Sequence, residues 1–438
     1  MKVYIETYGC QMNVNDTEVV FSILAKAGYT RTESMDEADV IMANTCSVRD
    51  NAEQRIWGRV EVFNQQRKSR PGVVVGILGC MAERLKDSLT STGKVDIVAG
   101  PDSYRRLPEM LADLGEGPQM DVRLSRDETY DDIVPLRTDK NGVSAFISIM
   151  RGCNNVCSYC VVPYTRGVER SRDAHTIVRE ACDVFERGYR EVTLLGQNVD
   201  SYRWTDADGR TVDFASLLEM VACVNPELRV RFATSNPQDI SDEVLLTMAR
   251  HDNICKHIHL PVQSGSDRML EKMRRRYTRE WYLERVAKIR EILPGCGLTT
   301  DVIAGFCSET EEDHVLTLSL FEEVGFDSAF MFAYSERPGT LAARKYPDDV
   351  PPEVKTRRLE EIIALQGRKS LERYREDIGK RFRVLVEGPS KRDASDLCGR
   401  ASNYKMCIWK DPVHRAGDYV TVEVTGCTQA TLLCKLAE

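Results

Sequence analysis

Residues 151–167 read Arg-Gly-Cys-Asn-Asn-Val-Cys-Ser-Tyr-Cys-Val-Val-Pro-Tyr-Thr-Arg-Gly and directly follow an apolar run at 143–150. Cys153, Cys157 and Cys160 share this short loop with the spacing Cys-x3-Cys-x2-Cys. Three thiolates on one loop can hold three irons of a [4Fe–4S] cluster and leave the fourth iron open to a ligand. The alternative is three structural or zinc-binding cysteines, but a closed zinc site would need a fourth protein ligand nearby.

The same loop resembles the signature loop of the radical S-adenosylmethionine (SAM) enzymes, in its cysteine spacing and in the aromatic Tyr159 before the last cysteine. The resemblance implies that the open iron binds the amino and carboxylate groups of SAM. It also implies that one electron from the cluster cleaves SAM to methionine and a 5′-deoxyadenosyl radical, which is chemistry that a cofactor must supply.

Strands and helices alternate six times from this loop onward. We predict strands at residues 144–150, 191–195, 229–233, 257–261, 299–305 and 329–333. Six such units indicate a partial (βα)6 barrel, open on one side, whose chemistry lies on the loops at the carboxyl ends of the strands.

Polar or glycine-containing segments follow these strands and indicate a pocket for a polar cofactor. Such residues also make ordinary turns, so the less usual turn residues carry more weight. The predicted cofactor contacts are Tyr159, Gln197, Ser235, Gln263, Ser264 and Arg337.

A second set of cysteines lies in the first 114 residues. There, strands predicted at 3–7, 40–44, 73–78 and 97–99 alternate with helical stretches such as 16–27 and 51–66. This alternation predicts a parallel sheet with helices on its faces. Cys10, Cys46 and Cys80 each follow a strand, at the edge where such sheets place ligand sites. They are candidates for a second three-cysteine cluster, and the alternative is three small buried side chains.

The C-terminal region predicts a small β-barrel of the oligonucleotide-binding type after a long helix at 353–375. Its strands are expected at 381–387, 405–409, 419–424 and 432–436. From Gly379 onward there are ten basic and seven acidic residues, so this tail carries +3 and the remainder −11 of the total −8. A basic appendage favours a polyanion partner, although charged segments are often simply solvated.

Aromatic side chains in the tail could bind nucleic acid or fill the core, and its cysteines could bind metal or be buried. Tyr404, Trp409 and Tyr419 could stack on single-stranded nucleic acid, with at least one of them filling the core of the barrel. The four tail cysteines do not follow a common metal-ligand spacing, so we expect them to be buried small residues: Cys398, Cys407, Cys427 and Cys434.

At 438 residues the chain is long enough for two or three domains. The three regions described above predict an α/β protein with domains at 1–118, 139–370 and 374–438 and a polar linker at 125–139. The chain has fifteen cysteines, no signal-peptide layout and no run of about 18 apolar residues. We therefore expect a cytoplasmic monomer without membrane association, in which cysteines bind metal instead of forming disulfides.

Several sequence motifs, spread over almost the whole chain, resemble those of the methylthiotransferase family of radical SAM enzymes. They lie at residues 7–13 (Thr-Tyr-Gly-Cys-Gln-Met-Asn), 44–49 (Asn-Thr-Cys-Ser-Val-Arg), 151–167, 260–266 (Leu-Pro-Val-Gln-Ser-Gly-Ser) and 276–278 (Arg-Tyr-Thr). Gln11-Met12 is typical of the branch that acts on tRNA, whereas the branch that acts on a ribosomal protein usually shows Pro-Lys there.

This resemblance implies an N-terminal methylthiotransferase domain with an auxiliary cluster, a radical SAM domain and a C-terminal TRAM-like, RNA-binding β-barrel. It implies two [4Fe–4S] clusters and SAM, with Cys10, Cys46 and Cys80 holding the cluster that carries sulfur. The expected reaction converts N6-isopentenyladenosine at position 37, in the anticodon loop of tRNA, to its 2-methylthio derivative. An electron donor such as a flavodoxin or ferredoxin and a sulfur source are the expected partners.

Two alternatives remain: a methylthiotransferase that modifies a ribosomal protein side chain, and a non-enzymatic iron–sulfur protein that binds RNA and senses redox state. The chain also departs from the family pattern at Asn236, where His is common, and at Cys307-Ser308, where Pro-Gly is common. A further basic segment could steer RNA or form a solvated helix face: Lys272, Arg274, Arg275, Arg276 and Arg279, interleaved with Tyr277, Trp281 and Tyr282.

Overall fold

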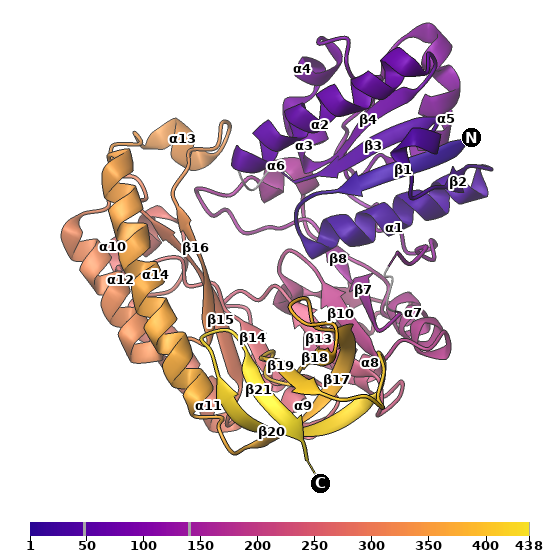
Figure 1. Cartoon of the computed structure of the whole chain (residues 1–438). Coiled ribbons are helices and arrows are strands. Elements are labelled where there is room, and N and C mark those ends of the chain that lie inside the picture. The colour runs from indigo at the N-terminus through magenta and orange to yellow at the C-terminus, as the bar shows by residue number, and fades with distance from the viewer. Residues whose placement is uncertain (47–49, 139–141, 438) are drawn as a thin grey trace.

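The computed structural model describes residues 1–46, 50–138 and 142–437, and Figure 1 shows its three packed units. Ser47, Val48 and Arg49, from the motif at residues 44–49, lie outside the described residues. Asp139, at the predicted end of the linker, lies outside them as well. No helix in the described ranges is long and apolar enough to cross a membrane.

The N-terminal unit is a parallel sheet with the strand order β2-β1-β3-β4-β5-β6. Its strands are β1 (Lys2–Thr7), β2 (Thr30–Arg31), β3 (Val40–Thr45), β4 (Val74–Gly79), β5 (Ile97–Ala99) and β6 (Gln119–Asp121). Its helices are α1 (Gln11–Lys26), α2 (Asp50–Ser69), α3 (Cys80–Leu85), α4 (Asp87–Thr90) and α5 (Leu107–Ala112). The predicted parallel α/β architecture is confirmed.

Alternation along the strands explains how this sheet is buried on both faces. Met42 packs in the core that includes residues of α1 and α5, whereas its neighbour Ile41 packs in the core that includes residues of α2 and α3. Helix α1 starts at Gln11, earlier than the predicted residue 16, and Cys10 stands in extended conformation at its N-cap position. This early start brings Cys10 to the helix end that faces the sheet edge.

The central unit contains the six predicted barrel strands. They are β7 (Ser144–Ser148), β10 (Glu191–Leu195), β13 (Arg229–Ala233), β14 (His257–His259), β15 (Gly297–Ala304) and β16 (Ser328–Ala333). They form two parallel three-stranded sheets, β13-β10-β7 and β14-β15-β16, and the parallel bridge between Val230 and Ile254 lies between them. The partial (βα)6 barrel is therefore confirmed.

Helices cover the outside of these strands (Figure 1). They are α7 (Ala174–Glu186), α8 (Phe214–Ala222), α9 (Asp242–Arg250), α10 (Asp267–Lys272), α11 (Arg279–Ile292), α12 (Glu311–Val324) and α14 (Pro352–Arg375). The short helix α13 (Leu341–Lys345) lies past the end of β16. A small hairpin of β11 (Arg203–Thr205) and β12 (Thr211–Asp213) lies between β10 and α8 in the chain.

The cysteine loop is held at its base by β8 (Met150–Arg151), which pairs antiparallel with β9 (Arg170–Ser171). Helix α6 (Val162–Arg166) completes the segment between them. Gly152 has φ +79°, and a Cβ there would lie 2.0 Å from the carbonyl oxygen of Val168. Only glycine fits this close crossing of the two chain segments.

The C-terminal unit is a closed barrel with the strand order β17-β18-β19-β21-β20. Its strands are β17 (Arg381–Pro389), β18 (Asp396–Arg400), β19 (Met406–Lys410), β20 (Tyr419–Cys427) and β21 (Leu432–Leu436). The predicted β-barrel is confirmed; β18 was not among the strands located from the sequence, because its short segment contains a charged residue at each end and a glycine. Trp409 is only 1% exposed and fills the core, and its Nε1 donates to Asp411 at 3.2 Å.

This barrel packs against the amino-terminal ends of the central strands (Figure 1). Arg229 and Arg231 of β13 donate to the carbonyl oxygens of Arg400 and Ala401, at 2.6 and 3.0 Å. The Tyr419 hydroxyl donates to the carbonyl oxygen of Glu227 at 3.0 Å. Tyr419 therefore packs at a domain contact, so its predicted role as a free stacking platform is wrong.

Candidate functional site

The three N-terminal cysteines converge at the carboxyl ends of neighbouring strands. Cys10 precedes α1, Cys46 directly follows β3, and Cys80 is the first residue of α3. A Cβ on Gly9, which has φ +124°, would lie 2.4 Å from Cβ and 3.4 Å from Sγ of Cys46. Such an approach requires glycine, and it brings Gly9 and Cys46, 37 positions apart in the chain, into contact.

The pKa values of Cys10 and Cys80 are shifted in opposite directions. A hydrogen bond with Cys46 and the positive charge of Arg166 lower the pKa of Cys10 to about 6, against the opposing effect of burial. Burial raises the pKa of Cys80, and the charge of Arg166 partly offsets this. Thiolates are the form that binds iron, so a positive charge beside the sulfurs favours metal binding.

Arg166 connects this group to the cysteine loop of the barrel, because it ends the short helix that follows Cys160. Its Nη2 donates to Asn13 Oδ1 at 3.1 Å and to Asp16 Oδ2 at 2.8 Å. Asn13 Oδ1 also accepts from Cys10 Sγ at 3.6 Å. The sequence did not predict this role, because nothing in the motif at residues 151–167 distinguishes a buried arginine from an exposed one.

The loop cysteines are surrounded by hydrogen-bond donors. Arg275 Nη1 donates to Cys157 Sγ at 3.3 Å, and the backbone N–H of Val162 donates to Cys160 Sγ at 3.4 Å. Burial raises the pKa of Cys153 to about 11 and that of Cys160 to about 12. Three thiols with cationic and backbone donors aimed at sulfur fit a [4Fe–4S] cluster, whose irons would displace the thiol protons.

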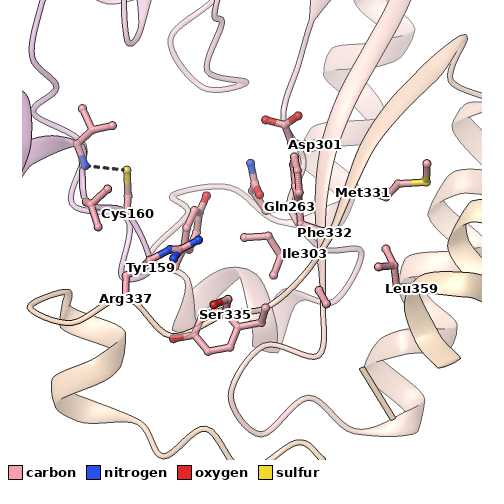
Figure 2. A pocket seen from close by; sticks show the side chains of 14 residues that line it. Tyr159, Cys160, Gln263, Asp301, Ile303, Met331, Phe332, Ser335, Arg337 and Leu359 are labelled. Carbon is pink, nitrogen blue, oxygen red and sulfur yellow. Dashed lines mark hydrogen bonds between the residues drawn. The ribbon is translucent and has the colours of Figure 1, made fainter. Parts of the chain in front are cut away.

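A cavity of about 520 Å³ opens beside this loop (Figure 2). Tyr159, Gln263 and Arg337 line it together with Cys160, so three of the predicted cofactor contacts share one space. Gln263 has φ +69° and is held by two backbone hydrogen bonds across β15, from its N–H to Asp301 and to its carbonyl from Ile303. Asp301, Tyr334 and Ser335 also line the cavity, and the sequence did not single them out.

The other three predicted contacts lie elsewhere. Ser264 is fully buried, and its hydroxyl lies 3.4 Å from that of Thr317 on α12. Gln197 follows β10, and its buried Oε1 has no hydrogen-bond partner among the described residues. Ser235 lies against Asp200, whose pKa burial raises to about 7. The structure does not bring these residues to the cavity beside Cys160.

The two unusual positions have separate surroundings. The backbone N–H of Asn236 donates to Asp200 Oδ2 at 3.1 Å, in the same buried polar group as Ser235. Cys307 is fully buried and packs in an apolar cluster with Phe306 and Tyr334.

The predicted role in steering RNA is wrong for some residues of the basic segment at 272–282. Tyr282 is fully buried and Tyr277 is 7% exposed, so neither can stack on RNA. Arg275 is used inside the fold, where it contacts Cys157, Tyr277 and the carbonyl oxygen of Pro261. The amphipathic spacing of this segment reflects core packing of α11 and support of the cysteine loop.

Comparisons with known families match three successive segments of the chain. Residues 2–100 match the uncharacterized protein family UPF0004, residues 147–321 the radical SAM superfamily, and residues 375–436 the TRAM domain. The radical SAM match implies a [4Fe–4S] cluster and SAM as cofactors.

Solved structures share the fold at low sequence identity. The radical SAM methyltransferase TsrM from Kitasatospora setae has a TM-score of 0.56 and 14% identity, over 78% of this chain and 75% of that chain. The cobalamin-dependent radical enzyme OxsB has a TM-score of 0.53 and 12% identity, over 83% of this chain and 56% of that chain.

Curated relatives are much closer. The tRNA-2-methylthio-N(6)-dimethylallyladenosine synthase of Bacteroides thetaiotaomicron is 56% identical over 98% of this chain and 95% of its own length. The protein of the same name from Porphyromonas gingivalis is 53% identical over 100% of this chain and 95% of its own length. The chain therefore belongs to the family of tRNA-2-methylthio-N6-dimethylallyladenosine synthases among the radical SAM enzymes.

Proposed function

We propose that this enzyme inserts sulfur at C2 of N6-isopentenyladenosine at position 37 of tRNA and methylates it, giving the 2-methylthio derivative. One observation carries the proposal: Arg337 lines the cavity beside Cys160, and its guanidinium also lies within electrostatic range of Cys46. The Arg337 guanidinium thus lies near a cysteine of each three-cysteine group. A radical centre and a sulfur carrier must act on the same carbon, and this arrangement allows that.

Six cysteines would hold two clusters. Cys153, Cys157 and Cys160 would bind the cluster that cleaves SAM, with Tyr159, Gln263 and Arg337 beside the bound SAM. Cys10, Cys46 and Cys80 would bind a second [4Fe–4S] cluster whose open iron carries sulfur. Gln197, Ser235 and Ser264 remain predicted contacts.

When bound, the first cluster and SAM supply a radical strong enough to activate the C2 position of adenine. The residues of the chain position and protect these groups. Arg275 places a positive charge beside Cys157, and Arg166 places one near Cys10 and Cys80.

A tRNA substrate agrees with the names of the relatives and with the basic C-terminal barrel. The target base lies in a loop, so presenting it costs less unstacking than in a duplex. We further propose that the enzyme is a cytoplasmic monomer that takes electrons from a flavodoxin or ferredoxin and sulfur from a separate source.

Mass spectrometry of tRNA nucleosides tests the function directly. Cells that lack this chain should accumulate N6-isopentenyladenosine, and expression of the chain should restore the 2-methylthio nucleoside. If tRNA nucleosides are unchanged while a ribosomal protein loses a methylthio group, the substrate assignment is wrong.

A further inference from the structure

A second cavity, of about 550 Å³, occupies the lumen of the partial barrel and is separate from the cavity beside Cys160. Its walls come from the barrel strands, from Glu191 and His257 at their amino-terminal ends to Ala233 at the carboxyl end of β13 and Thr234 directly after it. This volume lies within the range of about 300–1,000 Å³ that is typical of small-molecule sites.

All three units of the chain contribute to this lumen. Gly9, Cys10 and Gln11 of the N-terminal unit line it, and so do Glu387, Arg400 and Tyr404 of the C-terminal barrel. In Figure 1 the N-terminal and C-terminal units lie on opposite sides of the barrel strands. Cys10, a proposed ligand of the sulfur-carrying cluster, and the C-terminal barrel therefore border opposite parts of one cavity.

The C-terminal barrel closes the floor of the lumen. Tyr404 stacks on His257 with ring centroids 4.5 Å apart and an interplanar angle of 17°. Arg231 and Arg400, which flank Tyr404, are paired with Glu191 and Glu387, each at 2.7 Å. Because these charges are paired, the floor offers aromatic and polar surface without a net charge.

An apolar surface remains open inside the lumen. Phe330 of β16 is 54% exposed although it lies on a barrel strand, and it lines the cavity. His259 packs edge-on to Phe330 at 5.8 Å, and its Nε2 lies 3.4 Å from Asp301 Oδ1, which lines the neighbouring cavity beside Cys160. Phe146 and Phe232 also line the lumen. Exposed aromatic surface in a cavity indicates a ligand with an apolar part.

We propose that this lumen binds the target adenine and its N6 substituent, with Phe330 in contact with the branched five-carbon tail. The proposal rests on the proposed function. Cys10 borders the lumen, so C2 of the base can approach the sulfur carrier while N6, on a different edge of the ring, directs its tail along the barrel wall. His259 and Asp301 lie where this lumen meets the cavity assigned to SAM, so the base and SAM are neighbours.

The test measures binding selectivity with anaerobically reconstituted full-length enzyme and labelled anticodon stem-loop RNA, without SAM. One RNA carries N6-isopentenyladenosine at position 37, and the other carries adenosine. Wild-type enzyme should prefer the prenylated RNA by about tenfold or more, since even one methylene in an apolar pocket is worth roughly that factor. Phe330→Ala should remove most of the preference by weakening only the binding of the prenylated RNA.

Two further variants sharpen the test. Ser328→Phe adds bulk at an exposed lumen position and should also reduce the preference, although it adds apolar surface. Val315→Ala is the matched control, because Val315 is likewise 54% exposed but lies on α12 outside the lumen, and it should keep the wild-type preference.

Unchanged selectivity in Phe330→Ala, or an equal loss of affinity for both RNAs, would overturn the lumen assignment. Product analysis of the wild-type enzyme keeps this result apart from failure of the proposed function. If wild type makes no 2-methylthio product from the prenylated RNA, the proposed function fails and the lumen assignment fails with it.

Discussion

Asp16 and Arg166 form a buried ion pair, 2.8 Å long, between the first helix of the N-terminal unit and the segment that follows the radical SAM cysteine loop. Arg151 binds the other oxygen of the same carboxylate at 2.9 Å. Burial alone would raise the pKa of Asp16, but the charges of Arg151 and Arg166 hold it below its usual value. One carboxylate thus fixes the two cysteine groups relative to each other.

Asp16→Asn should destabilise the protein by about 3–5 kcal/mol, because it leaves buried Arg166 without its countercharge and Arg151 with only the longer contact to Asp102. Denaturant unfolding monitored by circular dichroism measures this change. Glu37→Gln, which removes an exposed ion pair with Lys2, is the control and should leave the unfolding midpoint unchanged. Equal midpoints for wild type and Asp16→Asn would show that this ion pair does not hold the units together.

Arg166→Gln should shift the reduction potential of the second cluster to a more negative value. Removing a positive charge and its hydrogen bonds near the sulfurs disfavours the added electron. The cluster can be observed alone in a background with Cys153, Cys157 and Cys160 changed to Ala, by redox titration with electron paramagnetic resonance. Arg170→Gln is the control, because Arg170 is equally buried but pairs with Asp102. A potential that moves equally in both variants would argue against a specific role of Arg166.

Changing Cys153, Cys157 and Cys160 to Ala should halve the iron and sulfide content from about eight of each per chain. SAM cleavage should be lost, since these thiols hold the cluster that supplies the electron. Iron and sulfide assays and chromatography of 5′-deoxyadenosine measure the two effects. Production of 5′-deoxyadenosine by this triple variant would disprove the assignment of the radical site.

Changing Cys10, Cys46 and Cys80 to Ala should separate radical formation from sulfur insertion. The barrel has its own core, so SAM cleavage to 5′-deoxyadenosine should continue. No 2-methylthio product should form, because the sulfur-carrying cluster is absent. Full methylthiolation by this variant would mean that sulfur reaches C2 by another route.

Binding of tRNA by the C-terminal barrel should depend on its exposed basic residues. Removing the whole tail is a poor test, because Arg400 and Ala401 contact β13 and Tyr404 closes the lumen. The triple change Lys391→Gln, Arg392→Gln and Lys410→Gln alters only exposed positions. It should weaken tRNA binding and reduce the slope of log affinity against log salt by about one per lost phosphate contact.

Titrations of labelled tRNA at two salt concentrations measure this slope. Arg187→Gln, at the exposed C-cap of α7, is the control and should bind tRNA as wild type does. Wild-type affinity and slope in the triple variant would place the RNA contacts elsewhere on the protein.

The class of each unit, the six barrel strands and the two cysteine groups could all be predicted from the amino-acid sequence. Apolar runs of strand length separated by helical periods predict βα units, and a cysteine after each strand must lie at one edge of a parallel sheet. Strands β10 and β13 agree with the prediction to the residue. Strand periodicity and the position of a cysteine after a strand are local properties of the sequence, so they can be recognised without knowledge of the tertiary contacts.

Which side chains contact one another could be seen only in the folded protein. Arg166 and Asp16 are 150 positions apart, and Tyr404 closes a lumen whose wall residue His257 comes from a different unit. The fold also separates Ser264, which faces Thr317, from its neighbour Gln263, which lines the cavity beside Cys160. Residue type and spacing cannot resolve such choices, because the direction of a loop side chain and the partner of a buried charge depend on how distant segments pack.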